Sequence, residues 1–439
     1  MILALALALL LIAWIFNLGL LVYALYALAG ILFVSHLFST GWISSLAAER
    51  QVKQTVAEPG QTIPVTIKVK NNARLPVSWV LVEDMLTQAK RDVPGQGLEV
   101  TGRHMEVTDF RPGGQMQMLY QLKCLRRGYY QIGPLLAETG DLFGLNRRYR
   151  VLQQPDYLLV NPEVISLEGY DVASRRPIGE IVMSHRLFED PTRIAGVRGY
   201  QNGDPLTRIH WRATARTGQL QSKVYEPSTV AGATVLLDFH QESFGRKDEP
   251  FRSELAVCCA ASIANAVQLL GQQIGLVTNG RDAADRIRRE GWRGDRRTRT
   301  EAAASAAMLD TNDRLRPLIV PTRRADDQFS RILETLARVE KSDGMGLLDL
   351  SGEAREQMPR DATVIAILTR VDLETGVALQ QLRHQGYAVT AIVNCHDYEI
   401  FGRLSGPLLA AGIEVRHLRD RDSIRTICKR QVLLAHGAG

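Results

Sequence analysis

An apolar run covers residues 1–38 and limits the possible folds more than any other stretch of the chain. One transmembrane helix needs about 20 apolar residues, so the run is long enough for a hairpin of two short helices. The sequence Asn17-Leu18-Gly19 is the natural turn between them. A single long, tilted helix is the alternative, although the run exceeds what one helix needs. The sequence therefore predicts a transmembrane helical hairpin in residues 1–40.

The charges that flank this run predict its orientation. No Lys or Arg precedes the run and no clear cleavage site follows it, which argues against a secretory signal peptide. The first positive charges, Arg50 and Lys53, come after it. By the positive-inside rule, both ends of the hairpin and the folded body lie on the cytoplasmic side of the inner membrane. The five scattered cysteines, an odd number without metal-ligand spacing, agree with a reducing compartment.

Residues 51–156 have the pattern of short strands. Residues 62–69 alternate between apolar and polar, with the turn pairs Pro59-Gly60 and Pro94-Gly95 among the boundaries. Several short strands at this spacing predict a small β-sandwich of immunoglobulin-like type. No cluster of residues here has a catalytic pattern, so we interpret the region as a spacer or a docking module.

Residues 199–227, GYQNGDPLTRIHWRATARTGQLQSKVYEP, concentrate Gly, Pro, Trp, His and Arg more than any other stretch. Asp204 before Pro205 is typical of an N-cap and a first helical turn. Gly218 can end that helix, and residues 220–225 alternate like a strand. The expected unit is a helix, a turn and a strand.

A cationic stripe distinguishes this signature segment. Arg208, Arg212 and Arg216 are four residues apart, so a helix aligns them on one face. One interpretation is structural: Asp204 caps the helix, Trp211 fills a core, and the arginines bond carbonyls or acidic neighbours. The other is functional: the stripe, together with Lys223, accepts a carboxylate or phosphate from a partner.

Strands and helices alternate after the signature. The expected strands are residues 233–238, 274–278, 363–369, 387–393 and 413–415, with apolar-faced helices between them. This alternation predicts an α/β domain with a doubly wound open sheet in residues 157–439. The pattern breaks down in residues 281–324, a basic insertion where eight arginines and four carboxylates lie between Arg281 and Arg299. A solvated insertion is expected, and attraction to the anionic inner leaflet or an acidic partner is the alternative. Aromatic interleaving for a nucleic-acid platform is missing, so no nucleic-acid partner is predicted.

The signature resembles that of the family named domain of unknown function 58, whose loose pattern is GD-P-x-R-x-I-x-W-x-x-[ST]-A-R-x-G-x-L. The matching positions are Asp204, Pro205, Arg208, Ile209, Trp211, Ala215, Arg216, Gly218 and Leu220. The upstream segment RRGYYQIGPLLAETGDLFGL, residues 126–145, resembles the one that precedes the signature in that family. The resemblance implies a bacterial, membrane-anchored protein with a von Willebrand factor A-like domain. It also implies a MoxR-type AAA+ ATPase as partner, while the biochemical activity of the family is unknown.

The resemblance suggests one metal site to weigh. In von Willebrand A domains an Asp-x-Ser-x-Ser loop after the first strand holds a divalent cation, with a Thr and an Asp from later loops. Here Asp238 remains, but His240 and Glu242 replace the serines, and His is a poor Mg²⁺ ligand. Thr369 and Asp372 follow a later strand. We expect a degenerate loop without a cofactor, and Asp238, Glu242 and Asp372 are the weak candidates for a divalent cation.

Other catalytic patterns are weak or missing. Cys395-His396-Asp397 reads like a triad, but neighbouring side chains diverge and cannot relay a proton. The chain has no P-loop, no Gly-x-Ser-x-Gly and no His-Glu-x-x-His. The sequence therefore favours a membrane-anchored, non-enzymatic interaction protein. The alternative is a divalent-metal-dependent hydrolase or nuclease built around Asp238, Glu242 and the arginines. The sequence leaves the oligomeric state and the client process open.

Overall fold

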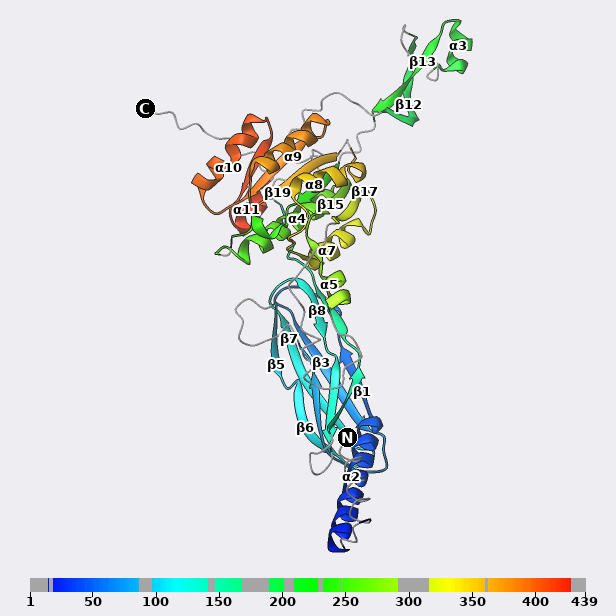
Figure 1. Ribbon diagram of the computed structural model, residues 1–439. Coiled ribbons are helices and arrows are strands. Elements are labelled where there is room, and N and C mark those ends of the chain that lie inside the picture. The colour runs from blue at the N-terminus through cyan, green and yellow to red at the C-terminus, as the bar shows by residue number, and fades with distance from the viewer. Residues whose placement is uncertain are drawn as a thin grey trace. The chain divides into compact units, whose positions relative to one another are not determined.

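The chain is described by a computed structural model that covers residues 15, 19–86, 97–140, 147–167, 189–200, 209–227, 232–245, 247–290, 316–359 and 362–427. It divides into two compact units (Figure 1). The first comprises Met1–Glu163, Gly280–Arg314 and Leu333–Gly344, and the second comprises Val164–Asn279, Leu315–Ile332 and Met345–Gly439. Each unit is described by itself below.

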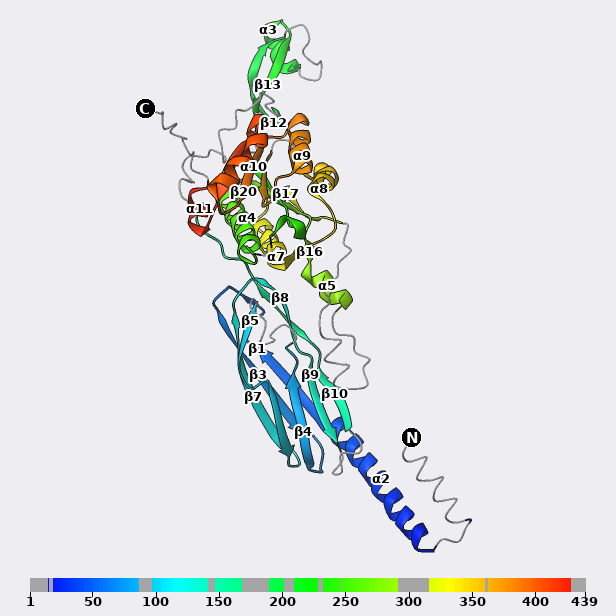
Figure 2. The same ribbon diagram turned by 60° about the vertical axis from the view of Figure 1, so that its left-hand side comes forward.

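An apolar helix, α2 (Gly19–Ser45), begins the described part of the first unit (Figure 2). Its segment Tyr23–Ser45 is long and apolar enough to cross a membrane, by length and composition. The helix begins at the last residue of the predicted turn, whereas the predicted first arm of the hairpin lies outside the described residues except Ile15. Helix α2 continues to Ser45, and β1 (Leu46–Val52) follows directly.

The end of α2 is packed into the β-sandwich. Trp42 and Ile43 are buried in the same hydrophobic cluster as the strand residues that follow. The Arg150 guanidinium donates a hydrogen bond to the Ser44 carbonyl oxygen at 2.8 Å, which satisfies one of the open carbonyls at the helix end. The helix is therefore joined to the sandwich by apolar contacts and by a hydrogen-bonded cap.

Short strands build the β-sandwich. One four-stranded sheet has the order β1-β3-β7-β5, a second has the order β10-β9-β4-β6, and a three-stranded sheet has the order β2-β11-β8. Their bounds are β2 (Val56–Ala57), β3 (Thr62–Asn71), β4 (Val77–Asp84), β5 (Leu98–Gly102), β6 (Met105–Phe110), β7 (Gln115–Cys124), β8 (Gly128–Ile132), β9 (Leu135–Gly140), β10 (Arg147–Gln153) and β11 (Asp156–Val160).

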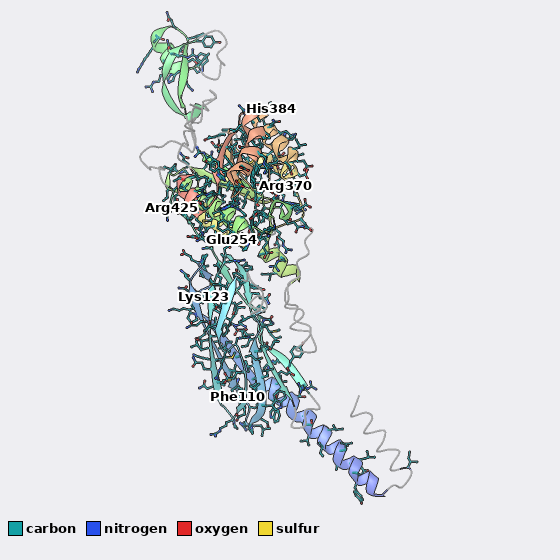
Figure 3. All side chains as sticks on the ribbon, turned by 90° about the vertical axis from the view of Figure 1, so that its left-hand side faces the viewer. Phe110, Lys123, Glu254, Arg370, His384 and Arg425 are labelled. Carbon is teal, nitrogen blue, oxygen red and sulfur yellow. The ribbon has the colours of Figure 1, made fainter. Side chains whose placement is uncertain are left out.

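The predicted alternation explains why these strands form. In β3, Ile63, Val65 and Ile67 are buried while the residues between them face outward or are half-buried. A strand exposes successive side chains on opposite faces, so this period of two gives β3 one apolar face. Phe110 of β6, labelled in Figure 3, is buried in the same core. The prediction of a β-rich, multidomain chain with an N-terminal apolar helix is confirmed.

The first unit also includes part of the predicted basic insertion. Strand β16 (Arg281–Asp282) pairs antiparallel with β18 (Val339–Glu340), and α5 (Ala283–Glu290) follows β16. Arg281 and Arg286 are buried, and Glu340 lies 3.2 Å from the first guanidinium and 2.6 Å from the second. The expectation of a solvated insertion is wrong at these positions, because Glu340, more than 50 residues later, pairs with both arginines.

The second unit is built on a six-stranded sheet with the order β17-β15-β14-β19-β20-β21. The strands are β14 (Gly232–Leu237), β15 (Gln273–Thr278), β17 (Leu318–Arg323), β19 (Ala362–Leu368), β20 (Val389–Asn394) and β21 (Glu414–Leu418). All neighbouring pairs are parallel except β15 and β17, which run antiparallel. The prediction that the pattern breaks down through residue 324 is therefore wrong for β17, which forms the edge of this sheet.

Helices pack against this sheet and cover its apolar residues. Helix α4 (Phe251–Leu269) lies against β14, β15, β19 and β20, while α8 (Leu347–Glu353) and α9 (Leu373–His384) share a core cluster with Leu236, Val364 and Ala366. The remaining helices are η2 (Gln241–Ser243), α7 (Gln328–Arg338), η3 (Ala354–Gln357), α10 (Tyr398–Ala410) and α11 (Arg421–Thr426). Every residue of β14 and of β19 is buried, as expected for strands covered on both faces.

The signature forms a separate two-stranded element. Strand β12 (Glu189–Gly199) pairs antiparallel with β13 (Gln221–Pro227), and α3 (Trp211–Thr217) lies between them in sequence (Figure 1). The hydrogen bonding between the two arms continues beyond the strands, because the Tyr200 amide donates to the Leu220 carbonyl at 2.8 Å. The predicted helix, turn and strand are all present, although the helix is shorter than expected.

Candidate functional site

The signature helix begins at Trp211, six residues later than Pro205, where the sequence predicts its first turn. The preceding segment is extended, because Ile209 forms an antiparallel bridge with Ser222 and the His210 amide donates to the Gln221 carbonyl at 2.8 Å. Ile209 and His210, the two described residues directly before Trp211, therefore pair with β13. Asp204 and Arg208 lie outside the described residues, so their predicted capping and binding roles stay predictions.

His210 rather than Asp204 caps the described helix. Its Nδ1 accepts a hydrogen bond from the Ala213 amide at 3.0 Å, which satisfies one of the open donors of the first turn. Gly218 ends the helix with a φ of 69°, in the left-handed region that glycine adopts without strain. The prediction that Gly218 stops the helix is confirmed.

The side chains of this helix face solvent. Trp211 is 69% exposed, so the expectation that it fills a core is wrong. Arg212 and Arg216 are also exposed, and Lys223 on β13 is half-buried. The helix has only seven residues and none of them is buried, so it contributes no apolar face to a core. The structure thus exposes an indole and, on the same short helix, two cations that are one helical turn apart.

The predicted metal candidates lie where parallel strands end. Asp238 follows β14 and is buried, and its carboxylate accepts hydrogen bonds from Asn279 Nδ2 at 2.9 Å, from Ser243 Oγ at 2.6 Å and from the His240 amide at 3.2 Å. Both carboxylate oxygens therefore have donors from the protein. Asn279 also accepts from the Phe239 amide at 2.6 Å, so it joins two consecutive positions of the loop. Sequence reasoning missed Asn279, whose position after β15 places it at the same sheet edge.

An arginine lies between the other two candidates. Arg370, labelled in Figure 3, is within 3.9 Å of the Glu242 carboxylate and 3.5 Å of the Asp372 carboxylate. Asp372 caps α9 by accepting from the Thr375 amide and hydroxyl, each at 2.8 Å. Burial raises the pKa of Asp372, but the Thr375 hydrogen bonds and the Arg370 charge outweigh it and hold the pKa below its ordinary value. Among the described residues, no three His, Cys, Asp or Glu side chains are grouped so as to hold a metal ion.

The apparent triad is not assembled as a relay. The Cys395 thiol is buried and contacts the Asp397 carbonyl oxygen at 3.7 Å, while the Asp397 carboxylate accepts from the Glu399 amide at 3.0 Å and caps α10. Burial raises the pKa of the Cys395 thiol to about 11, so it is protonated at neutral pH. The interpretation of this sequence as a strand-end loop agrees with these contacts.

His417 on β21, which the sequence analysis did not single out, lies near Cys395. Its ring stacks on Phe401 with centroids 4.4 Å apart, and its Nε2 lies 2.8 Å from the Cys395 carbonyl oxygen. Burial lowers the pKa of His417, and the charges of Arg252 and Arg419 lower it further. The hydrogen bond to the Cys395 carbonyl raises this pKa, but by less than the other effects lower it. The neutral ring therefore acts as a packed, hydrogen-bonded link between β20 and β21.

Two buried arginines of the first unit were also not predicted. Arg50 bonds Asp84 through two guanidinium nitrogens, and the Tyr120 hydroxyl donates to the same carboxylate at 2.6 Å. Arg127 donates to the carbonyl oxygens of Leu336 at 2.6 Å and Val339 at 2.9 Å. The burial of Asp84 could have been predicted from the sequence, because Asp84 occupies the next inward-facing position of the strand after Val80 and Val82. These contacts are structural and leave the signature as the exposed candidate.

Comparison with known proteins gives one curated relative. The chain is 26% identical over 242 residues to an uncharacterized protein, YeaD, from Bacillus subtilis (strain 168). The match covers 55% of this chain and 57% of that protein. The chain thus spans a little over half the length of its relative, whose description states no activity.

Solved structures resemble parts of the chain only distantly. The CARDB domain of the PF1109 protein from Pyrococcus furiosus is 14% identical, with 26% of this chain and 91% of that chain covered and a TM-score of 0.18. Proximal thread matrix protein 1 from the mussel byssus is 11% identical, with 45% and 46% covered and a TM-score of 0.28.

The family comparison covers the signature and much of the parallel sheet. The matched stretch includes the whole of α3, the strand-end loop at Asp238 and the capped helix at Asp372. Residues 196–404 match the model of the family described as Protein of unknown function DUF58.

Proposed function

We propose that this chain is a membrane-anchored adaptor that binds a protein partner through its signature segment. The observation that carries the proposal is that Trp211, Arg212 and Arg216 are all exposed on one short helix. Trp and Arg are enriched among the residues that dominate binding energy at protein interfaces. The signature therefore has the composition of a binding surface in the part of the chain that the family comparison matches.

The other parts of the chain fit this role. The segment Tyr23–Ser45, which is long and apolar enough to cross a membrane, serves in this proposal as one arm of a membrane hairpin, and both folded units lie in the cytoplasm of a bacterium. The six-stranded sheet is, in this proposal, a doubly wound von Willebrand A-like domain. Such domains recognise partners at the carboxyl ends of their strands, where Asp238 and Asp372 lie. The family resemblance makes a MoxR-type AAA+ ATPase the partner to test.

The environment of Asp238 supports an adaptor over the alternative, a metal-dependent hydrolase or nuclease. Three donors already occupy its carboxylate, and Arg370 lies within ion-pair distance of both Glu242 and Asp372. A cation would have to replace these contacts. Thermal melts with Mg²⁺, Mn²⁺ and Ca²⁺ compare the two functions, because a ligand that binds only the folded state raises the melting temperature. We expect no change, and a rise that disappears in Asp238→Asn would favour the hydrolase.

Affinity purification of the detergent-solubilised full chain tests the adaptor function. The bait proteins are the wild type, Arg212→Glu and Arg403→Glu, with bound proteins identified by mass spectrometry. Arg403 is an exposed arginine on α10 and gives the same charge change at a different place. We expect an AAA+ ATPase with the wild type and the control, and its loss with Arg212→Glu. Equal recovery with all three would move the interface away from the signature, and recovery with none would contradict the adaptor proposal.

A further inference from the structure

We propose that the tip of the signature hairpin binds an acidic protein segment that presents carboxylates beside an apolar side chain. The hairpin tip is defined as the described residues 197–200 and 209–223. This inference rests on the proposed function, because it specifies the chemistry of the partner that the adaptor binds. It requires nothing about the identity of that partner.

The first argument is charge complementarity. The hairpin tip carries four cationic residues, Arg198, Arg212, Arg216 and Lys223, and the described residues that define it include no Asp or Glu, whereas Asp204 lies in residues 201–208, outside the described part of the chain. Within the described part of the chain, no ion pair involves Arg212, Arg216 or Lys223. Arg212 and Arg216 are one helical turn apart, which matches the spacing of an acidic pair on a partner helix. Guanidinium groups bind carboxylates through two parallel hydrogen bonds, so two exposed arginines select for carboxylates.

The second argument is the apolar surface that the hairpin tip also exposes. Trp211 is 69% exposed, Val197 48% and Leu220 45%. In the same element Ile209 and Ser222 are buried, so the hairpin has an inner side and still leaves its largest side chain outside. Trp contributes a large contact area with little loss of side-chain entropy when it is covered. The bound segment therefore needs an apolar side chain close to its carboxylates.

The third argument is that hydrogen bonds join the helix of the tip to its strand. The Gln221 amide donates to Thr214 Oγ1 at 3.0 Å, and the His210 amide donates to the Gln221 carbonyl at 2.8 Å. These bonds join Gln221, which follows Gly218, to Thr214 of α3 and to the helix cap His210, which precede it. A surface that is already ordered loses less entropy on binding, so more of the interaction energy appears as affinity.

An anionic membrane is the competing ligand, since cations and Trp also favour lipid headgroups. Recognition of acidic lipids is typical of clusters of about four to eight basic residues. The hairpin tip is at the low end of that range, and its four charges are divided among β12, α3 and β13. The pair of arginines on one turn of α3 therefore favours a protein ligand, and a lipid is an outcome of the test.

Site-specific photo-crosslinking in the full membrane-bound chain tests this inference. Trp211 is replaced by p-benzoylphenylalanine, which the exposed position accommodates, and the cells are irradiated before the membranes are solubilised. The matched control carries the same residue in place of Leu409, which is 54% exposed near the end of α10. The crosslinked peptide is identified by mass spectrometry.

We expect a crosslink from position 211 to a segment that contains at least two carboxylates within one helical turn. Its yield should fall about tenfold in Arg212→Glu, a change that corresponds to about 1.4 kcal/mol, and stay unchanged in Arg403→Glu. The segment is then synthesised as a peptide with Glu and Asp replaced by Gln and Asn, and this peptide should compete at least tenfold less well than the acidic one. A crosslink to lipid, or to a neutral or basic segment, would overturn the inference.

The inference and the proposed function fail in different ways. If position 211 gives no crosslink while affinity purification still recovers a partner, the adaptor function stands and the hairpin tip is not its acidic-segment site. If neither experiment yields a partner, the proposed function fails and the inference fails with it.

Discussion

The buried ion pair of the β-sandwich gives a stability prediction that can be worked from the structure. Asp84 on β4 is fully buried, and its carboxylate binds Arg50 and accepts from the Tyr120 hydroxyl at 2.6 Å. In Asp84→Ala, the one ionic partner that Arg50 keeps among the described residues is Asp156, whose side chain is partly exposed. Removal of one member of a buried pair costs about 3–5 kcal/mol, because the remaining charge is left without compensation in a medium of low polarity.

Hydrogen exchange on the full chain measures this effect locally. The amides of β3 and β7 pair with each other along the sandwich, so their protection reports its opening. A loss of 3–5 kcal/mol lowers the protection factor by about two to nearly four powers of ten. The matched control is Glu99→Gln, which breaks the exposed pair with Lys123 at 3.5 Å and should change protection by less than about tenfold.

Tyr120→Phe separates the hydrogen bond from the charge. It deletes one donor to Asp84 and leaves the ion pair intact, so a smaller loss of about 1–3 kcal/mol is expected. If Asp84→Ala lowers protection no more than Glu99→Gln, the buried pair contributes no net stability and the reasoning is refuted.

Four further outcomes are expected. Trp211→Ala should change stability by less than about 0.5 kcal/mol in thermal melts, whereas a buried Trp would cost about 3–5 kcal/mol. Arg127→Ala, which removes two charge-assisted hydrogen bonds, should speed amide exchange in residues 333–340 roughly ten- to hundredfold. The pKa of His417 is lowered in the folded chain, so protonation of this residue favours the unfolded chain. Its contribution to stability is therefore present above about pH 6.5 and is lost as the pH falls. In melts from pH 8 to 5, the melting temperature should decline less in His417→Gln than in the wild type. Maleimide should leave Cys124 and Cys395 unmodified in the native protein and label both in urea, because burial raises the pKa of each thiol to about 11.

The sequence by itself determined the elements whose periodicity is local. Alternation in residues 62–69 predicted β3, the continuous apolar run in residues 233–238 predicted β14, and Gly218 marked the end of α3. These features follow from side-chain direction and backbone conformation within a few residues, which a single segment contains. The apolar N-terminus likewise predicted a helix long enough to span a membrane.

Only the tertiary structure decided which side chains are paired and which are exposed. Ile209 pairs with Ser222, α3 begins at Trp211, and the indole of Trp211 lies in solvent. Glu340 forms ion pairs with Arg281 and Arg286, two buried arginines of the predicted insertion. Periodicity reveals that a face is apolar, but it carries no information about the segment that covers that face. The charge stripe was visible in the sequence, whereas its place on an exposed, hydrogen-bonded hairpin tip required the fold.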